Sequence, residues 1–205
     1  ITQLEGDQVR AGLYLISANT KYTSPSGDEA HTDKAFQVVP QLYYTHAFNN
    51  APLVLGVGVY APYGLGLDWG DNPPFGLIAQ RGKLLYATVN PVIAWRVHDT
   101  LSLAMGPTLN YSEADLENQS FAFKGDDIAF GFNAGLLWQP HEKWSFGLNY
   151  RSATEMNYDG ESDFTAFPGS SASTQAEADF PCFAVAGISF RPTTNWNFEV
   201  NVDWT

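Results

Sequence analysis

The stretch that decides the fold is Trp196-Asn197-Phe198-Glu199-Val200-Asn201-Val202-Asp203-Trp204. Apolar and polar side chains alternate at every position of this stretch. Successive residues of a β-strand point to opposite faces, so one face of such a strand is wholly apolar and the other wholly polar. The helical spacing of three and four residues does not fit the stretch. It therefore predicts a β-strand that separates two different environments.

The same alternation recurs through most of the chain, for example at 101–111, 128–139 and 144–151. From it we expect an all-β protein with nine strands, at approximately 9–18, 35–47, 53–63, 82–97, 101–111, 127–139, 144–154, 182–192 and 196–205. Most of these segments have about 10 residues or more, the length that a tilted strand needs to cross a bilayer. Strands of soluble proteins usually have about 5–6 residues. The lengths favour a membrane-spanning sheet.

The connections between these strands alternate in length. Tight turns are expected at 48–52, 98–100, 140–143 and 193–195, and long loops at 19–34, 64–81, 112–126 and 155–181. Most acidic residues fall in the long loops, and aromatic residues gather at strand ends, as they do at membrane–water boundaries. An antiparallel up-and-down transmembrane β-barrel, with short turns at one end and long extracellular loops at the other, has this pattern. The alternative is a soluble β-sandwich, whose strands also alternate.

The odd number of expected strands has a consequence for domain organisation. Bacterial single-chain barrels have an even number of strands. An open sheet edge in lipid leaves backbone groups unpaired, at a cost of several kcal/mol each. We therefore expect residues 1–205 to be part of a single, larger outer-membrane barrel domain, with further strands outside this sequence.

Charge and composition exclude several other classes of protein. The formal net charge is −12 at pH 7 and basic clusters are lacking, so nucleic acid is not an expected partner. A single cysteine, Cys182, excludes an intrachain disulfide and a multi-cysteine metal site. The sequence has no G-x-S-x-G motif, no H-E-x-x-H motif and no phosphate-binding glycine loop. We expect no enzyme activity, no catalytic or metal-binding residues and no cofactor.

Three stretches carry a resemblance to a known family. They are 56–65 (GVGVYAPYGL), 90–97 (NPVIAWRV) and 124–135 (KGDDIAFGFNAG), the last leading on to 147–152 (GLNYRS). In this order they resemble the FadL-type outer-membrane transport family, whose members carry long-chain fatty acids or aromatic hydrocarbons. The resemblance spans most of the chain.

The resemblance implies a porin-like, monomeric barrel of about 14 strands in the bacterial outer membrane, in contact with membrane lipid and lipopolysaccharide. An N-terminal hatch closes such a barrel, and this sequence begins about where the hatch should end. A hydrophobic small molecule is captured among the loops, passes to an internal apolar pocket and leaves sideways at a kinked third strand. The 112–126 loop is shorter here than the helical loop of the best-known fatty-acid transporters.

The third expected strand carries the candidate lateral gate, which consists of Gly56, Gly58 and Pro62. Glycine inside a strand weakens it and often marks a bend, and Pro62 has no N–H for the ladder. A kink that opens the barrel wall is one interpretation. The other is that the glycines make room for a plug and that Pro62 simply ends the strand.

Further candidates for ligand binding are Trp69, Phe75, Leu77, Phe121, Phe123, Arg96 and Arg151. The first five are apolar residues in long loops, where exposed apolar groups suggest a binding groove. Packing of each loop against itself is the alternative. The two arginines fall on inward faces, where they can pair with a carboxylate. We favour instead an internal network that holds the plug.

We therefore expect an outer-membrane channel for passive uptake of long-chain fatty acids or aromatic hydrocarbons. The alternative from another class is a soluble or surface β-protein that binds ligands or partners without transport. The two differ in where the apolar strand faces lie. If Trp144, Phe146, Phe198 and Trp204 pack together in an interior, the channel interpretation is wrong.

Overall fold

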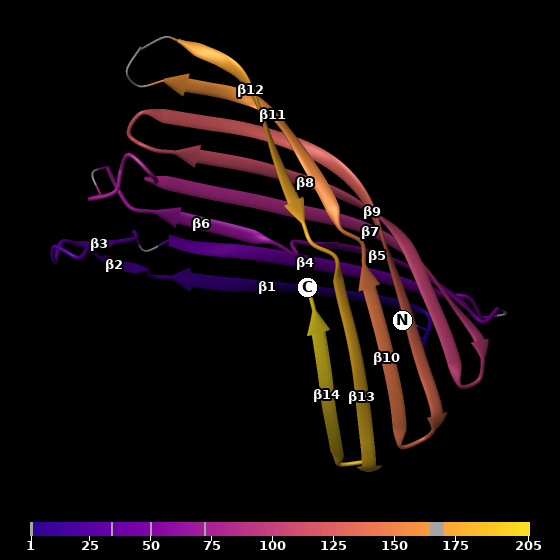
Figure 1. Cartoon of the computed structure of the whole chain (residues 1–205). Helices are drawn as coiled ribbons and strands as arrows, with labels where there is room; N and C mark the ends of the chain where they lie inside the picture. Colours follow the sequence, from indigo (N-terminus) through magenta and orange to yellow (C-terminus); the bar gives the residue numbers. More distant parts are fainter. Residues whose placement is uncertain (1, 34, 50, 72, 165–169) are drawn as a thin grey trace.

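Nine strands form a single antiparallel path in the computed structural model, which describes residues 2–33, 35–49, 51–71, 73–164 and 170–205. Along the sheet the order is β1 (Asp7–Ala18), β4 (Ala35–Ala47), β5 (Leu53–Tyr60), β7 (Arg81–His98), β8 (Leu101–Glu117), β9 (Phe121–His141), β10 (Trp144–Arg151), β13 (Phe183–Thr193) and β14 (Trp196–Trp204). Figure 1 shows β1 and β4 lying across the view while β10, β13 and β14 stand steeply to them, so the sheet curls. The predicted nine-stranded meander is confirmed. Among the described residues no helix is long and apolar enough to span a bilayer.

The segments predicted to be long loops contain more strand than expected. They hold β2 (Lys21–Thr23), β3 (Glu29–His31), β6 (Gly64–Asp68), β11 (Thr154–Phe164) and β12 (Ser171–Phe180). The expected loop at 112–126 is mostly the ends of β8 and β9, which are joined at 118–120. Part of the expected loop at 155–181, residues 165–169, lies outside the described residues. At β11 and β12 the prediction failed because these strands are polar, although the burial of β11 still alternates with period two.

The two faces of the sheet have the reverse of the usual distribution of polarity. The outer face is apolar, and on it Phe130 and Trp204 are each 77% exposed. The inner face buries polar side chains such as Thr88 and Asn110, which are joined by a hydrogen bond of 2.8 Å. Trp144 and Phe198 are likewise exposed rather than packed in a core. The soluble-sandwich alternative is therefore wrong, because nothing in the described chain covers the apolar faces.

A small apolar core lies on the inner face, near the end of the sheet that carries the long connections. We call it the inner cluster, and its buried members are Tyr86, Ala114, Phe123, Met156, Tyr158 and Phe180. It forms because the start of β11 lies over the inner face instead of continuing beside β9. The Tyr158 hydroxyl lies 2.7 Å from Ser112 Oγ of β8, and the Tyr86 hydroxyl of β7 lies 2.8 Å from Thr154 Oγ1. The β11–β12 hairpin is thereby fixed to β7 and β8.

Candidate functional site

The ladder of the sheet is interrupted after β5. This strand ends at Tyr60, and β6 resumes at Gly64 against the same neighbour, β7. Pro62 lies in the break, as its missing N–H led us to expect. On the other side, β4 pairs with β5 only from Leu42 to Ala47. Residues 35–41 of β4 and the whole of β6 therefore face each other without ladder pairs in the described structure.

The two candidate glycines of the gate lie within regular ladder, not at the break. Gly56 pairs with Thr45 on one side, and Gly58 pairs with Tyr43, while both continue their pairing to β7 on the other. The ladder is uninterrupted at both glycines, so the kink there stays a prediction. A Cβ at Gly58 would lie 2.9 Å from the ring of Tyr43 and 3.3 Å from that of Tyr60. Gly58 therefore makes room for these two rings, and the alternative interpretation, that the glycines make room for a plug, stays a prediction.

A cavity of about 510 Å³ occupies the interruption between β4, β6 and β7. We call it the lateral cleft, and its lining includes Phe36, Gln37, Val39, Tyr60, Tyr63 and Tyr86. Two hydrogen bonds cross it: Gln37 Nε2 donates to the Gly66 carbonyl at 3.2 Å, and the Asp33 N–H donates to the Asp68 carbonyl at 2.8 Å. A side-chain amide thus closes a mainly apolar opening in the wall.

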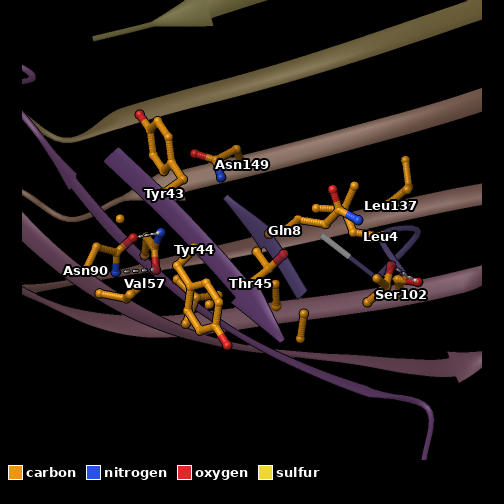
Figure 2. Close-up of a pocket in the computed structure, with 18 of the residues that line it drawn as sticks. Leu4, Gln8, Tyr43, Tyr44, Thr45, Val57, Asn90, Ser102, Leu137 and Asn149 are labelled. Carbon is orange, nitrogen blue, oxygen red and sulfur yellow. Dashed lines mark hydrogen bonds between the residues drawn. The ribbon is translucent and has the colours of Figure 1, made fainter. Parts of the chain in front are cut away.

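A second cavity, of about 670 Å³, lies farther along the inner face, and we call it the interior pocket. Figure 2 shows Tyr43, Thr45 and Asn90 around it, together with Leu4 and Gln8 from the beginning of the described chain. Thr45 is buried, and its hydroxyl has no hydrogen-bond partner within the described structure. The pocket combines an apolar lining with a few polar groups, which is typical of small-molecule sites.

The first described residues run along the inner face beside this pocket. The Thr2 hydroxyl donates to Ser102 Oγ at 2.9 Å, and Arg96 Nη2 donates to the Thr2 carbonyl oxygen at 2.5 Å. Arg96 therefore holds the chain's own N-terminal segment, and it lines neither the interior pocket nor the lateral cleft. This contact fits the network interpretation of Arg96 better than a ligand-binding role.

Arg151, like Arg96, lines neither cavity, but its side chain has a different partner. Its guanidinium lies over the ring of Tyr60, 5.4 Å from the ring centroid. The Tyr60 ring is in turn stacked on Tyr43, with a centroid distance of 6.0 Å and an interplanar angle of 23°. Sequence reasoning identified Arg151 and the glycines but missed both tyrosines, because an inward tyrosine on a strand carries no distinguishing pattern.

The five apolar loop candidates do not come together in one site. Phe75 packs edge-on against Trp69 at 4.9 Å and against Tyr22 of β2 at 4.7 Å. In the hairpin of β2 and β3, Lys21 donates a hydrogen bond to Glu29, and this bond lowers the pKa of the Glu29 carboxyl. Farther along, Phe121 contacts Phe164, Phe123 is buried in the inner cluster, and Leu77 is 70% exposed. The expected groove is not formed by these residues.

Comparison with known proteins agrees with this fold. The family model described as outer membrane protein transport protein (OMPP1/FadL/TodX) matches residues 1–122 and 119–205. A long-chain fatty acid transport protein of Escherichia coli O6:H1 is 22% identical over 196 residues, covering 78% of this chain and 44% of that protein. A 47 kDa outer membrane protein of Pasteurella multocida is 24% identical over 182 residues, covering 77% of this chain and 42% of that protein. The chain thus spans less than half the length of these relatives.

Solved structures resemble the sheet closely. A Pseudomonas aeruginosa FadL homologue superposes with a TM-score of 0.75 and 16% identity, covering 97% of this chain and 58% of the other. The Pseudomonas putida toluene transporter TodX superposes with a TM-score of 0.73 and 13% identity, covering 98% of this chain and 62% of the other. The fold and the family match point to the bacterial outer membrane. This chain belongs to the outer-membrane transport protein family of FadL and TodX.

Proposed function

We propose that the complete protein is a passive outer-membrane channel that admits long-chain fatty acids or aromatic hydrocarbons and releases them sideways into the bilayer. The observation that carries this proposal is the lateral cleft, an apolar opening where β4 and β6 lack ladder pairs. An unpaired stretch in a membrane barrel wall costs several kcal/mol for each unsatisfied backbone group. Such a stretch is therefore expected where it serves the passage of a solute.

The names of the relatives support the substrate class. One is called a long-chain fatty acid transport protein and one a toluene transporter. Partition supplies the driving force, because moving an apolar solute from water into the bilayer gains about 0.8 kcal/mol per CH₂ group. No residue needs to do covalent chemistry, and we propose no enzymatic step.

The proposed path has three stages. The long connections, which we propose to be extracellular, receive the solute, the interior pocket holds it and the lateral cleft releases it. Gln37 holds the lateral cleft closed, because its amide donates a hydrogen bond to the Gly66 carbonyl, which has no ladder partner on β4. We further propose that the barrel acts as a monomer and that its apolar outer face contacts lipid acyl chains, with lipopolysaccharide at the extracellular end.

The test is uptake of labelled oleate and toluene by cells that contain or lack the complete protein. Gly64→Phe should fill the lateral cleft, because Gly64 lines it and a Cβ there has only the Leu84 carbonyl oxygen near it, at 3.8 Å. Gly147→Phe is the matched control, since a Cβ at Gly147 of β10 meets nothing within 4 Å. Both variants must reach the outer membrane in equal amounts. Equal uptake of both solutes in the two variants and the wild type argues against lateral release.

A further inference from the structure

Tyr60 stands where the two cavities meet. It is the last residue of β5, and among the described residues it alone lines both the interior pocket and the lateral cleft. Tyr60 therefore marks the direct route from the interior pocket to the lateral cleft.

The Tyr60 ring is held by the guanidinium of Arg151, which comes from a distant strand of the same sheet. Arg151 is the last residue of β10, whereas Tyr60 belongs to β5, and β7, β8 and β9 lie between these two strands. The guanidinium nevertheless lies 5.4 Å from the Tyr60 ring centroid. The arginine side chain therefore reaches a ring four strands away along the curled sheet, and Tyr43 of β4 stacks on the same ring.

We infer that Tyr60 and Arg151 form a selectivity filter that favours aromatic and anionic solutes over neutral saturated ones; the inference rests on the proposed transport function. A solute that passes has to separate the guanidinium from the ring. An aromatic solute offers Arg151 a replacement π face, and a carboxylate offers it a charge-assisted hydrogen bond. A saturated hydrocarbon offers neither, so Arg151 loses its partner while the solute passes. Selectivity arises from this difference between solutes and not from size.

The test uses two solutes with the same carbon skeleton, toluene and methylcyclohexane, and measures the ratio of their initial uptake rates in cells with the complete protein. We expect Arg151→Met to lower the toluene preference by about fivefold, mainly by speeding methylcyclohexane. Tyr60→Leu should speed both solutes and keep the ratio, because an Arg151 without a partner still gains a π face only from toluene. Tyr60→Phe keeps the π face and Arg151→Lys keeps the cation, so both should retain the preference.

Arg191→Met, which removes an arginine of β13 that bonds Asn197, is the matched control and should leave the ratio unchanged. A wild-type ratio in Arg151→Met, or wild-type rates of both solutes in Tyr60→Leu, with transport intact, overturns the filter and leaves the channel standing. If wild-type cells take up neither solute faster than cells lacking the protein, the channel proposal fails and the filter fails with it. Heat-modifiable mobility of the folded barrel on gels verifies that each variant is assembled.

Discussion

The side-chain amide of Asn90 donates a hydrogen bond of 2.7 Å to the carbonyl oxygen of Pro107, across a stretch where β7 and β8 have no ladder pairs. The pairs stop at Val89 and resume at Ile93, and Pro91 lies between them. Because proline has no N–H, neither Pro91 nor Pro107 can donate to a ladder here. Asn133 of β9 completes the arrangement by donating to Asn90 Oδ1 at 2.8 Å. A side-chain amide thus replaces the missing backbone bonds.

This relationship predicts the effect of Asn90→Leu on stability. The substitution leaves the Pro107 carbonyl and the Asn133 amide without their partner, and an unsatisfied buried polar group costs about 1–3 kcal/mol. Urea unfolding of the complete barrel in lipid vesicles measures the loss. The control is Asn149→Leu, on an exposed residue of β10, which should change stability by less than about 0.5 kcal/mol. Equal losses in the two variants contradict the bracing role of Asn90.

Met156 provides a prediction about the inner cluster. Its side chain is completely buried, at 0% exposure, among Tyr86, Tyr158 and Phe180. Met156→Ala should lower the free energy of unfolding by about 2–5 kcal/mol, because the cavity left behind is only partly filled by relaxation. Leu77→Ala, at a position that is 70% exposed, should cost much less. Urea unfolding measures both, and a small loss for Met156→Ala means that β11 is not held against the inner face.

Gln37 provides a prediction about the rate of release. Gln37→Leu removes the hydrogen bond to the Gly66 carbonyl that closes the lateral cleft. Since one such bond contributes about 0.5–1.5 kcal/mol, we expect toluene uptake to rise about twofold to tenfold. Gln175→Leu is the control, because Gln175 lies on β12 and bonds Asp159, away from the cleft. Slower uptake in Gln37→Leu indicates that the amide guides the solute instead of retaining it.

The sequence predicted the nine strands because alternation is a local property. In Trp196–Trp204 the alternation of apolar and polar residues already separates the lipid-facing side from the inner side. No contact with a distant residue is needed to predict this. The polar strand β11 was missed because its position depends on contacts with other strands and not on a local pattern. Its acidic residues indicate solvent, and only contacts of Met156 and Tyr158 with β7 and β8 decide that it lies over the inner face.

The candidate site depended on contacts between distant strands and was predicted less well. Arg151 was correctly placed on the inward face, but its neighbour Tyr60 lies on β5 and reaches it across the interior. No periodicity links two positions so far apart. Similarly, Pro62 indicated an interruption from its own chemistry, whereas the lateral cleft also needed the register of β4 against β5. Features that depend on one residue were predictable, and features that depend on register were not.

The orientation of the apolar face predicts the effect of a charge at Phe130. This side chain lies on the outer face of β9 and is 77% exposed. If that face meets lipid, Phe130→Lys should destabilise the barrel by about 2–4 kcal/mol when the position is near the bilayer midplane. In a soluble protein, a lysine at so exposed a position should change stability by less than about 0.5 kcal/mol. Asn149→Lys, on the inner face, is the matched control and should be tolerated. Urea titration of the complete protein folded into vesicles distinguishes a lipid-facing from a water-exposed outer face. Only a lipid-facing outer face makes Phe130→Lys costly while Asn149→Lys is tolerated.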